Sequence, residues 1–123
     1  MEGVEMSDTF FVRATDGKWV DTPEGNRRRV IAYTEQLMVV EFAFEAGGEG
    51  WLHSHPHVQS SYVAEGRFEV TIDGHTASLG EGDVYIVPSG LTHGVKALAK
   101  GRLIDSFTPY RADFVASPGK PDQ

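Results

Sequence analysis

The amino-acid sequence predicts an all-β fold, a sandwich or a barrel, and within this class we expect a single-domain jelly-roll β-barrel. Three observations support this expectation. β-prone segments of about four to eight residues follow one another along the chain, turn-forming residues separate them at intervals of about eight to twelve residues, and no stretch shows a convincing helical period. With 123 residues and no cysteine, the chain can bury one core without disulfides.

The N-terminal half contains short and then longer strand segments. Residues 10–12 and 18–20 are β-prone pieces on either side of the turn dipeptide Asp16-Gly17. Residues 21–26 are strand breakers, and two longer strands follow them. The second of these alternates apolar with more polar residues, which indicates one buried face and one mostly solvated face. We place these two strands at residues 28–33 and 37–44.

The C-terminal half continues with strands that are separated by turns. A histidine-rich strand is expected after the glycine loop at residues 47–50. Asp73-Gly74 is the strongest short-range signal for a hairpin, and a Pro-Ser-Gly corner at residues 88–90 precedes a later strand. The other strands are expected at residues 60–64, 67–72, 75–79, 84–87, 92–97 and 102–107.

Charge and hydropathy argue against two classes of partner. The net charge of −7 repels a phosphate backbone, and we interpret the single basic run, residues 27–29, as a solvated strand end or a subunit contact, so no nucleic-acid partner is expected. No apolar run approaches the ~20 residues that span a bilayer, and the N-terminus is acidic. We therefore expect no membrane partner and a cytoplasmic location. Residues 1–8 and 115–123 are expected to be flexible, on either side of a domain at 9–114.

A histidine-rich stretch contains the clearest functional signal. His53, His55 and His57 occupy alternate positions, and Gln59 follows at the same spacing. In an extended strand every second side chain shares a face, so these four could point into one cavity. His93 follows the corner at 88–90, where an incoming strand would bring its ring beside the first set. Neutral imidazoles are common ligands of transition metals, and three or four protein ligands with an open position are typical of catalytic sites.

The spacing of these residues resembles the two sequence motifs of the cupins. The first is matched by Gly47, His53, His55, Gln59 and Gly66, with five, one, three and six residues between them, and the second by Gly82, Pro88, Gly90 and His93, with five, one and two between them. The sequence departs from the usual pattern at Gln59, where cupins usually carry Glu, and at Ala97, where Asn is frequent.

The resemblance implies a jelly-roll barrel that holds one divalent transition metal ion per chain. His53, His55, Gln59 and His93 are its expected ligands, and zinc, nickel, manganese, iron and copper all suit this set. The alternative is that these are satisfied polar residues in a barrel that has lost its metal. We interpret His57 as a loop histidine near the cavity mouth, because Pro56 breaks the strand there, with an extra ligand or a proton shuttle as the alternative.

The last predicted strand contains a second group of candidate site residues. Asp105 and Phe107 share a face, and Arg111 follows four residues later. An arginine binds a carboxylate with two hydrogen bonds, an aromatic ring covers the face of a sugar, and a carboxylic acid can move protons, so this set suits a small anionic sugar. The alternative is that Asp105 forms an ordinary salt bridge with Arg102 or Arg111 while Phe107 fills the core.

A narrower resemblance favours the first interpretation. The segments HSHPHVQSSYVAEG, IVPSGLTHG and IDSFTPYRADF are similar to the KdgF-type cupins of pectin degradation. This resemblance implies a metal site of three His and one Gln, an active site served by Asp105, Phe107 and Arg111, and ring opening of 4,5-unsaturated uronates to linear keto sugars. Two other functions remain open, a non-catalytic binding module and another cupin enzyme such as a dioxygenase, a lyase or a sugar isomerase. Small cupins usually pair through their sheets, so we expect a homodimer.

Overall fold

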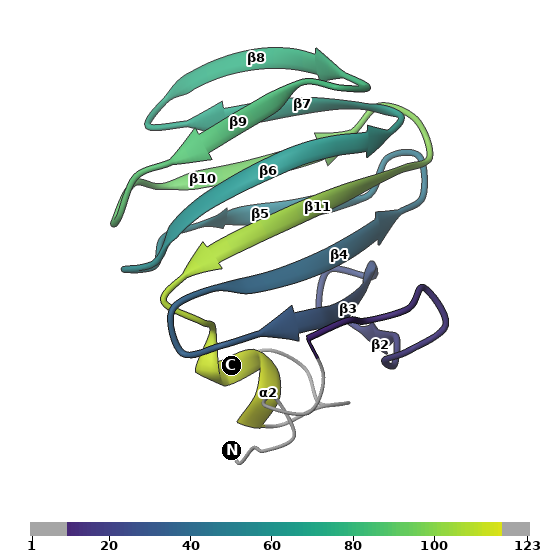
Figure 1. Ribbon diagram of the computed structural model, residues 1–123. Coiled ribbons are helices and arrows are strands. Elements are labelled where there is room, and N and C mark those ends of the chain that lie inside the picture. Colours follow the sequence, from purple (N-terminus) through teal and green to yellow (C-terminus); the bar gives the residue numbers. More distant parts are fainter. Residues whose placement is uncertain (1–9, 117–123) are drawn as a thin grey trace.

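The computed structural model describes residues 10–116 as two antiparallel sheets that face each other, with one short helix (Figure 1). The larger sheet has the strand order β2-β3-β4-β11-β6-β9 and the smaller has the order β5-β10-β7-β8. This is a jelly-roll arrangement in which the two sheets are not closed into one continuous barrel. The elements are β2 (Val20–Asp21), β3 (Arg27–Tyr33), β4 (Met38–Phe44), β5 (Glu49–His53), β6 (Val58–Glu65), β7 (Arg67–Ile72), β8 (His75–Gly80), β9 (Val84–Val87), β10 (His93–Ala97), β11 (Gly101–Thr108) and α2 (Ala112–Ala116).

The hairpin between β7 and β8 shows how local sequence determines the register. Asp73 and Gly74 both have positive φ angles, 51° and 81°, which a two-residue turn of the primed type requires. Asn, Asp and Gly tolerate this conformation best, so the dipeptide selects the turn. Ile72 therefore pairs with His75, and the predicted hairpin is confirmed.

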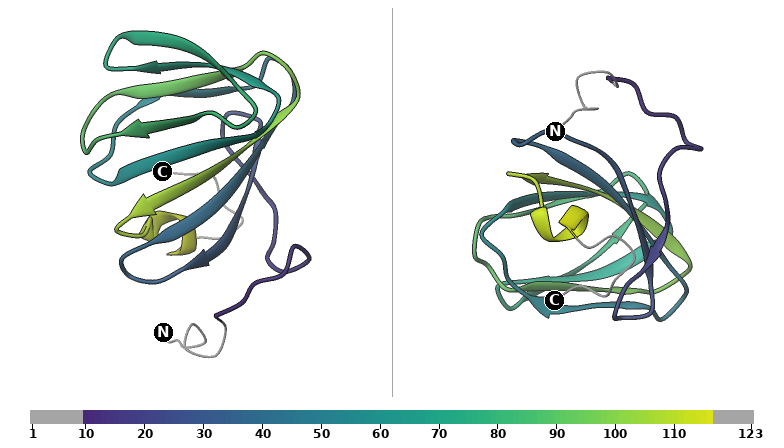
Figure 2. Two further views of the ribbon diagram at one scale, coloured as in Figure 1. Left: turned by 45° about the horizontal axis from the view of Figure 1, so that its top comes forward. Right: turned by 90° about the horizontal axis from the view of Figure 1, so that it is seen from below.

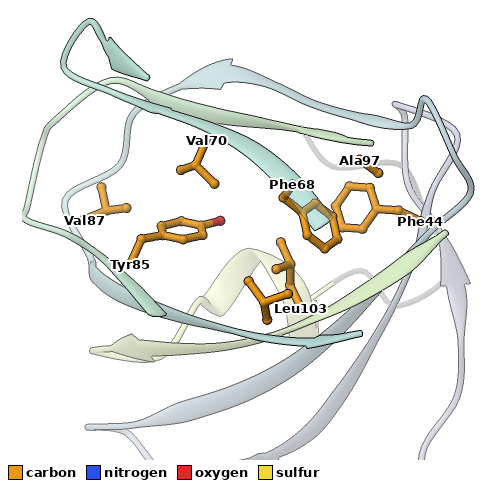
Figure 3. Packing of buried hydrophobic residues seen from close by; sticks show 8 residues of the cluster. Phe44, Phe68, Val70, Tyr85, Val87, Ala97 and Leu103 are labelled. Carbon is orange, nitrogen blue, oxygen red and sulfur yellow. The ribbon is translucent and has the colours of Figure 1, made fainter. Parts of the chain in front are cut away.

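The core lies between the two sheets. Phe68 and Val70 from β7 contact Leu103 from β11 and Tyr85 from β9, as Figure 3 shows. A second cluster, Met38, Val40, Phe107 and Phe114, lies near α2. In the view from below in Figure 2, α2 crosses the end of the space that the strands surround. The helix therefore covers one end of the interior.

The N-terminal predictions are only partly confirmed. Residues 10–12 do not form a strand, and the Phe10 and Phe11 side chains are 82% and 79% exposed. Only Val20 of the expected segment 18–20 enters a strand. The expected flexible residues 1–8 lie outside the described part of the chain, as do residues 117–123 of the expected tail. No helix among residues 10–116 is long and apolar enough to cross a membrane.

Two expectations are each wrong in part. One is that the outer face of β4 is solvated, and the other is that the basic run at residues 27–29 is solvated. Glu41 is buried on that face, and its two carboxylate oxygens accept hydrogen bonds from Arg29 Nη2 at 2.7 Å and Arg102 Nη1 at 2.6 Å. Arg28 is also buried, with its guanidinium 4.1 Å from the ring centroid of Phe114. The exposed Arg27 lies 4.8 Å from the ring centroid of Trp19, so all three basic residues have partners within the chain.

Candidate metal centre and cavity

Four candidate ligands come from three elements and a loop. His53 is the last residue of β5, His55 lies in the loop before β6, Gln59 is in β6, and His93 is the first residue of β10. The prediction that they alternate along one extended strand is wrong, because the strand ends at His53. The imidazole groups still converge, and the ligand atoms of His53, His55 and His93 lie within 4.8 Å of one another. These three histidines could hold a metal ion.

The register of β5 against β10 brings two of these histidines face to face. His93 pairs with His53, and the register then shifts so that Val95 pairs with Gly50. Close approach of the strands depends on Gly94, where an added Cβ would lie 2.8 Å from the Gly50 carbonyl oxygen. A larger side chain at position 94 would push β5 away from β10 and separate the two rings.

The backbone orients each of the three imidazoles. Nδ1 of His53 lies 2.8 Å from the Trp51 carbonyl oxygen, Nδ1 of His55 lies 3.1 Å from that of His57, and Nδ1 of His93 lies 3.0 Å from that of Leu91. A carbonyl oxygen can only accept, so each Nδ1 carries the hydrogen and donates it. The lone pair is then on Nε2, which is the tautomer of a metal ligand whose other nitrogen is held by the backbone.

Hydrogen bonds also orient the side-chain amide of Gln59, with its oxygen toward the histidines. Its Nε2 donates to Ser61 Oγ at 2.9 Å and to Asp105 Oδ2 at 3.3 Å, which leaves Oε1 for the histidines. Oε1 lies 3.0 Å from Nε2 of His55 and 3.2 Å from Nε2 of His93. Because His55 and His93 both carry their hydrogen on Nδ1, the lone pairs of their Nε2 atoms and of Gln59 Oε1 face one another with no hydrogen between them. A cation among these atoms resolves the conflict, so the donor set fits a metal ion of the kind that nitrogen and oxygen ligands bind.

Burial favours the neutral form of two of the imidazoles, those of His55 and His93. Burial, the main cause, lowers the pKa of His93 to about 4, with smaller contributions from His53, His55 and Arg111. The pKa of His55 is also lowered, first by burial and then by the positive charge of Arg111. Metals bind the unprotonated ring, so both rings are in the ligating form at neutral pH.

A row of polar side chains crosses the larger sheet beside Gln59. Ser61 pairs with Asp105 of β11 on one side and with Tyr85 of β9 on the other. All three are buried, and Asp105 Oδ1 has no hydrogen-bond partner among the described residues. Burial raises the pKa of Asp105 to about 7, although the neighbouring Ser61 hydroxyl and the charge of Arg111 oppose the shift. Ser61 and Tyr85 were not among the predicted site residues, because the sequence does not reveal which strands are neighbours.

Arg111 and Phe107 lie in the same interior, next to the candidate ligands. Phe107 pairs with Gln59 across β11 and β6, and the Arg111 guanidinium lies 5.2 Å from the centroid of its ring. The alternative interpretation of a salt bridge to Asp105 is not supported, because among residues 10–116 Arg111 is ion-paired with Asp113, and Arg102 with Glu41 and Glu65. Phe107 is 1% exposed and belongs to the core as well as to the cavity wall.

One cavity of about 380 Å³ brings most of the predicted residues together. His57 lies outside the histidine cluster, in the loop where it was expected, with its ring centroid 6.4 Å from that of Phe107. Burial, as the main cause, and the charge of Arg111 lower the pKa of His57. The predicted residues that line the cavity are His53, Gln59, His93, Asp105, Phe107 and Arg111.

Fold and site together define a class: a jelly-roll protein with a candidate mononuclear metal centre between its sheets. The cupin domain family matches residues 40–106. The pectin degradation protein KdgF of Dickeya dadantii is 41% identical over 99 residues, which cover 79% of this chain and 90% of that protein. The chain therefore belongs to the cupin family and, within it, to the group that contains KdgF.

Solved structures agree with this assignment. KdgF from Halomonas sp. matches with a TM-score of 0.82 and 35% identity, covering 87% of this chain and 99% of that one. An RmlC-like cupin from Shewanella frigidimarina matches with a TM-score of 0.83 and 38% identity, covering 87% and 96% of the two chains. The structural similarity therefore extends over most of the chain.

Proposed function

We propose that this protein opens the ring of 4,5-unsaturated uronates to linear keto sugars, a step in the breakdown of pectin or alginate. One observation carries the proposal: a histidine cluster that could hold a metal ion, a buried carboxyl oxygen without a partner among the described residues and an arginine lie at one cavity. The relationship to a pectin degradation protein supports the choice of substrate. The proposed ligands of one divalent ion are His53, His55, Gln59 and His93.

The reaction needs proton movement but no oxidant. In a 4,5-unsaturated uronate the ring oxygen joins C1 to C5, and the C4–C5 double bond makes it an enol ether. The C1 hydroxyl loses its proton and becomes an aldehyde as the bond between C1 and the ring oxygen breaks. The electrons of that bond stay on the oxygen at C5. The enol formed there takes a proton at C4 and becomes a ketone, so substrate and product are isomers.

The residues of the cavity suit the parts of this reaction. Arg111 binds the carboxylate of the uronate, because a guanidinium offers two parallel donors. Phe107 contacts the face of the sugar ring. Asp105 takes the proton from the C1 hydroxyl and returns it at C4 through Oδ1, because Oδ2 is engaged by Gln59. A divalent ion in the cluster supplies Lewis acidity, which polarises substrate oxygens, and the neutral ligands leave its double charge undiminished.

The enol ether absorbs in the ultraviolet, which provides a direct test. Purified protein is mixed with 4,5-unsaturated galacturonate, and the absorbance is followed with and without a chelator. The proposal requires faster loss of absorbance than in buffer, and slower loss after chelation. Binding without loss of absorbance would instead indicate a binding module, and consumption of dioxygen would indicate a dioxygenase.

Two expectations about the whole protein remain part of the proposal, a homodimer and a cytoplasmic location. Exposed apolar side chains on the outer face of β6 and β9 support pairing through the larger sheet. Tyr62 pairs with Val84, and Ile86 follows on the same face, with exposed fractions of 47%, 53% and 55%. A mass measurement in solution tests the dimer, and replacement of Ile86 by Glu should shift it toward the monomer.

A further inference from the structure

Arg111 is held by a carboxylate that its sequence neighbourhood supplies. Its Nε donates to Asp113 Oδ1 at 3.1 Å, and its Nη2 donates to Asp113 Oδ2 at 2.9 Å. Two parallel bonds of this kind fix the plane of the guanidinium as well as its position. The Arg111 side chain is only 12% exposed, whereas that of Asp113 is 40% exposed.

Asp113 binds one edge of the Arg111 guanidinium and does not occupy the other edge. Asp113 engages the edge formed by Nε and Nη2, so it does not occupy the edge formed by Nη1 and Nη2. Arg111 lines the cavity that also contains Gln59 and Asp105. A guanidinium can therefore bind Asp113 through its side edge and a second carboxylate through its end edge at the same time.

Aromatic rings fix the arginine from its faces. The Arg111 guanidinium carbon lies 4.1 Å from the ring centroid of Phe114 and 5.2 Å from that of Phe107. Phe114 is buried between Arg111 and Arg28, and its backbone N–H donates to the Arg111 carbonyl at 3.0 Å. The rings contact the faces of the guanidinium, whereas the two bonds to Asp113 act within its plane and therefore set its rotation in that plane.

Segment 110–114 is anchored to the larger sheet. The Tyr110 ring stacks on that of Tyr33 in β3, with centroids 5.4 Å apart, and the Tyr110 N–H donates to the Glu35 carbonyl at 3.2 Å. The backbone that carries Arg111 and Asp113 is therefore placed independently of their ion pair. Loss of the pair would release the side chain of Arg111 more than the segment itself.

We propose that Asp113 is a positioning residue that holds the end edge of Arg111 toward the cavity for the carboxylate of the substrate. This inference rests on the proposed function, since it assigns the preorganisation of the group that binds the uronate. A long side chain that is already ordered loses less conformational entropy when it binds. Asp113 thereby acts on affinity and does not touch the reacting atoms.

Simple electrostatics predicts that removal of Asp113 strengthens substrate binding, whereas the positioning role predicts weaker binding, so the two can be distinguished. Asp113 is an anion near an anionic substrate, so its removal by charge alone should strengthen binding. If Asp113 only occupies Arg111 until substrate displaces it, removal should strengthen binding as well. Positioning is the role for which removal weakens binding.

The experiment compares Asp113→Ala, Asp113→Asn and Asp113→Glu with the wild-type protein loaded with metal. We expect the first two to raise KM for the unsaturated uronate, and Kd for D-galacturonate measured by calorimetry, by about three- to tenfold. The change in kcat should stay below about twofold, and Asp113→Glu should recover part of the affinity. In an Arg111→Lys background, Asp113→Ala should add little, because lysine cannot form the paired bonds.

Controls separate positioning from folding. Glu65→Ala removes an exposed carboxylate that pairs with Arg102 outside the cavity, and it should leave KM and Kd unchanged. A KM and a Kd that stay equal or fall in folded Asp113→Ala would overturn the inference. A lower kcat and a lower melting temperature that accompany the higher KM, without recovery in Asp113→Glu, would also overturn the inference, since they indicate a structural role.

The proposed reaction can be disproved while the inference about Asp113 still holds. If the wild-type protein binds D-galacturonate but leaves the unsaturated uronate unchanged, the reaction is wrong, and the Kd values of the variants still decide the role of Asp113. If the wild-type protein binds neither sugar, both ideas fall.

Discussion

Asp105 lies in an environment that suits a proton carrier. One of its carboxylate oxygens accepts from Gln59, while the other is buried without a partner among the described residues. An unpartnered buried oxygen is costly, so a site that keeps one has a reason other than stability. The contact with Gln59 also couples the acid to the candidate metal centre, because the same amide presents its oxygen to His55 and His93.

Replacing Asp105 by Asn should abolish most turnover while metal and substrate still bind. The amide keeps the shape of the side chain but cannot exchange a proton near neutral pH, so kcat should fall by about 10² to 10⁴-fold. Steady-state kinetics, calorimetry with D-galacturonate and metal analysis measure the three quantities. Asp16→Asn, at an exposed turn, is the matched control. A variant that unfolds at lower temperature and loses affinity and turnover together would mean that Asp105 is structural.

Gln59 connects the histidines to the acid through its two amide atoms. A Glu at this position would add a negative ligand for the ion, but it would also replace the amide donor by an acceptor that faces Asp105 Oδ2 at 3.3 Å. Two carboxylates at that distance cannot both be ionised without a large cost. The amide would therefore keep the charge of a bound ion high, and it lets Asp105 ionise.

Replacing Gln59 by Glu should tighten metal binding and lower kcat. The added charge attracts the ion, the net charge of the bound centre drops, and Asp105 is driven toward its protonated form. Metal affinity is measured by competition with a chelating dye, and Gln36→Glu in the exposed turn between β3 and β4 controls for added charge. Unchanged or faster turnover would show that neither Lewis acidity nor the ionisation of Asp105 limits the reaction.

The strands were predictable where local sequence decides them. The segments 67–72 and 84–87 coincide with β7 and β9, because alternation and flanking turns are encoded within each segment. The prediction failed where distant partners decide. His55 was assigned to a strand but lies in a loop, and α2 has five residues, too few for a helical period. The histidine cluster could still be predicted, because motif spacing reflects the three-dimensional arrangement. The ion pair between Arg111 and Asp113 could not be predicted.

The outer face of the larger sheet carries an ion-pair row that strand alternation did not predict. Glu41 of β4 lies between Arg29 of β3 and Arg102 of β11, with its side chain only 6% exposed. Burial would raise its pKa, but hydrogen bonds and charge from both arginines outweigh burial and hold the pKa below the ordinary value of 4.5. A carboxylate with a lowered pKa stabilises the fold above its unfolded pKa, and this contribution is lost as the pH falls through the folded pKa.

Replacing Glu41 by Gln should destabilise the protein at neutral pH and weaken its acid sensitivity. The neutral amide leaves two guanidiniums without their carboxylate, at a cost of roughly 1–3 kcal/mol in the free energy of unfolding. Urea denaturation at neutral pH, and again below the ordinary Glu pKa, should show the difference between wild type and variant shrinking at the lower pH. Glu65→Gln removes the exposed partner of the same row and should cost less. A difference independent of pH would contradict the role assigned to the Glu41 charge.

The ligands of the candidate metal centre come from both sheets, whose strands do not pair with each other among residues 10–116. His53 and His93 belong to the smaller sheet, and Gln59 belongs to the larger one. The sheets do not close into one barrel, and at this point they are linked by the loop between β5 and β6, whose His55 carbonyl accepts from the Gly90 N–H at 2.9 Å. An ion bound to both sheets would oppose their separation, which links occupancy of the site to the stability of the whole fold.

Metal removal should therefore lower the melting temperature, and variants of the cluster should lose this response. A ligand that binds only the folded state stabilises it by about 2.7 kcal/mol at a free concentration of about one hundred times Kd. Replacing any two of His53, His55 and His93 by Ala should abolish binding of one ion per chain and make the melting temperature insensitive to chelator. His75→Ala is the matched control, because His75 is exposed on β8 and lies outside the cluster. If the wild-type protein, reloaded with divalent ions, binds none by elemental analysis and melts at one temperature with or without chelator, the three imidazoles are packing residues. The ring-opening proposal then falls with the metal, and the cavity with Arg111 is left as a binding site for a small carboxylate.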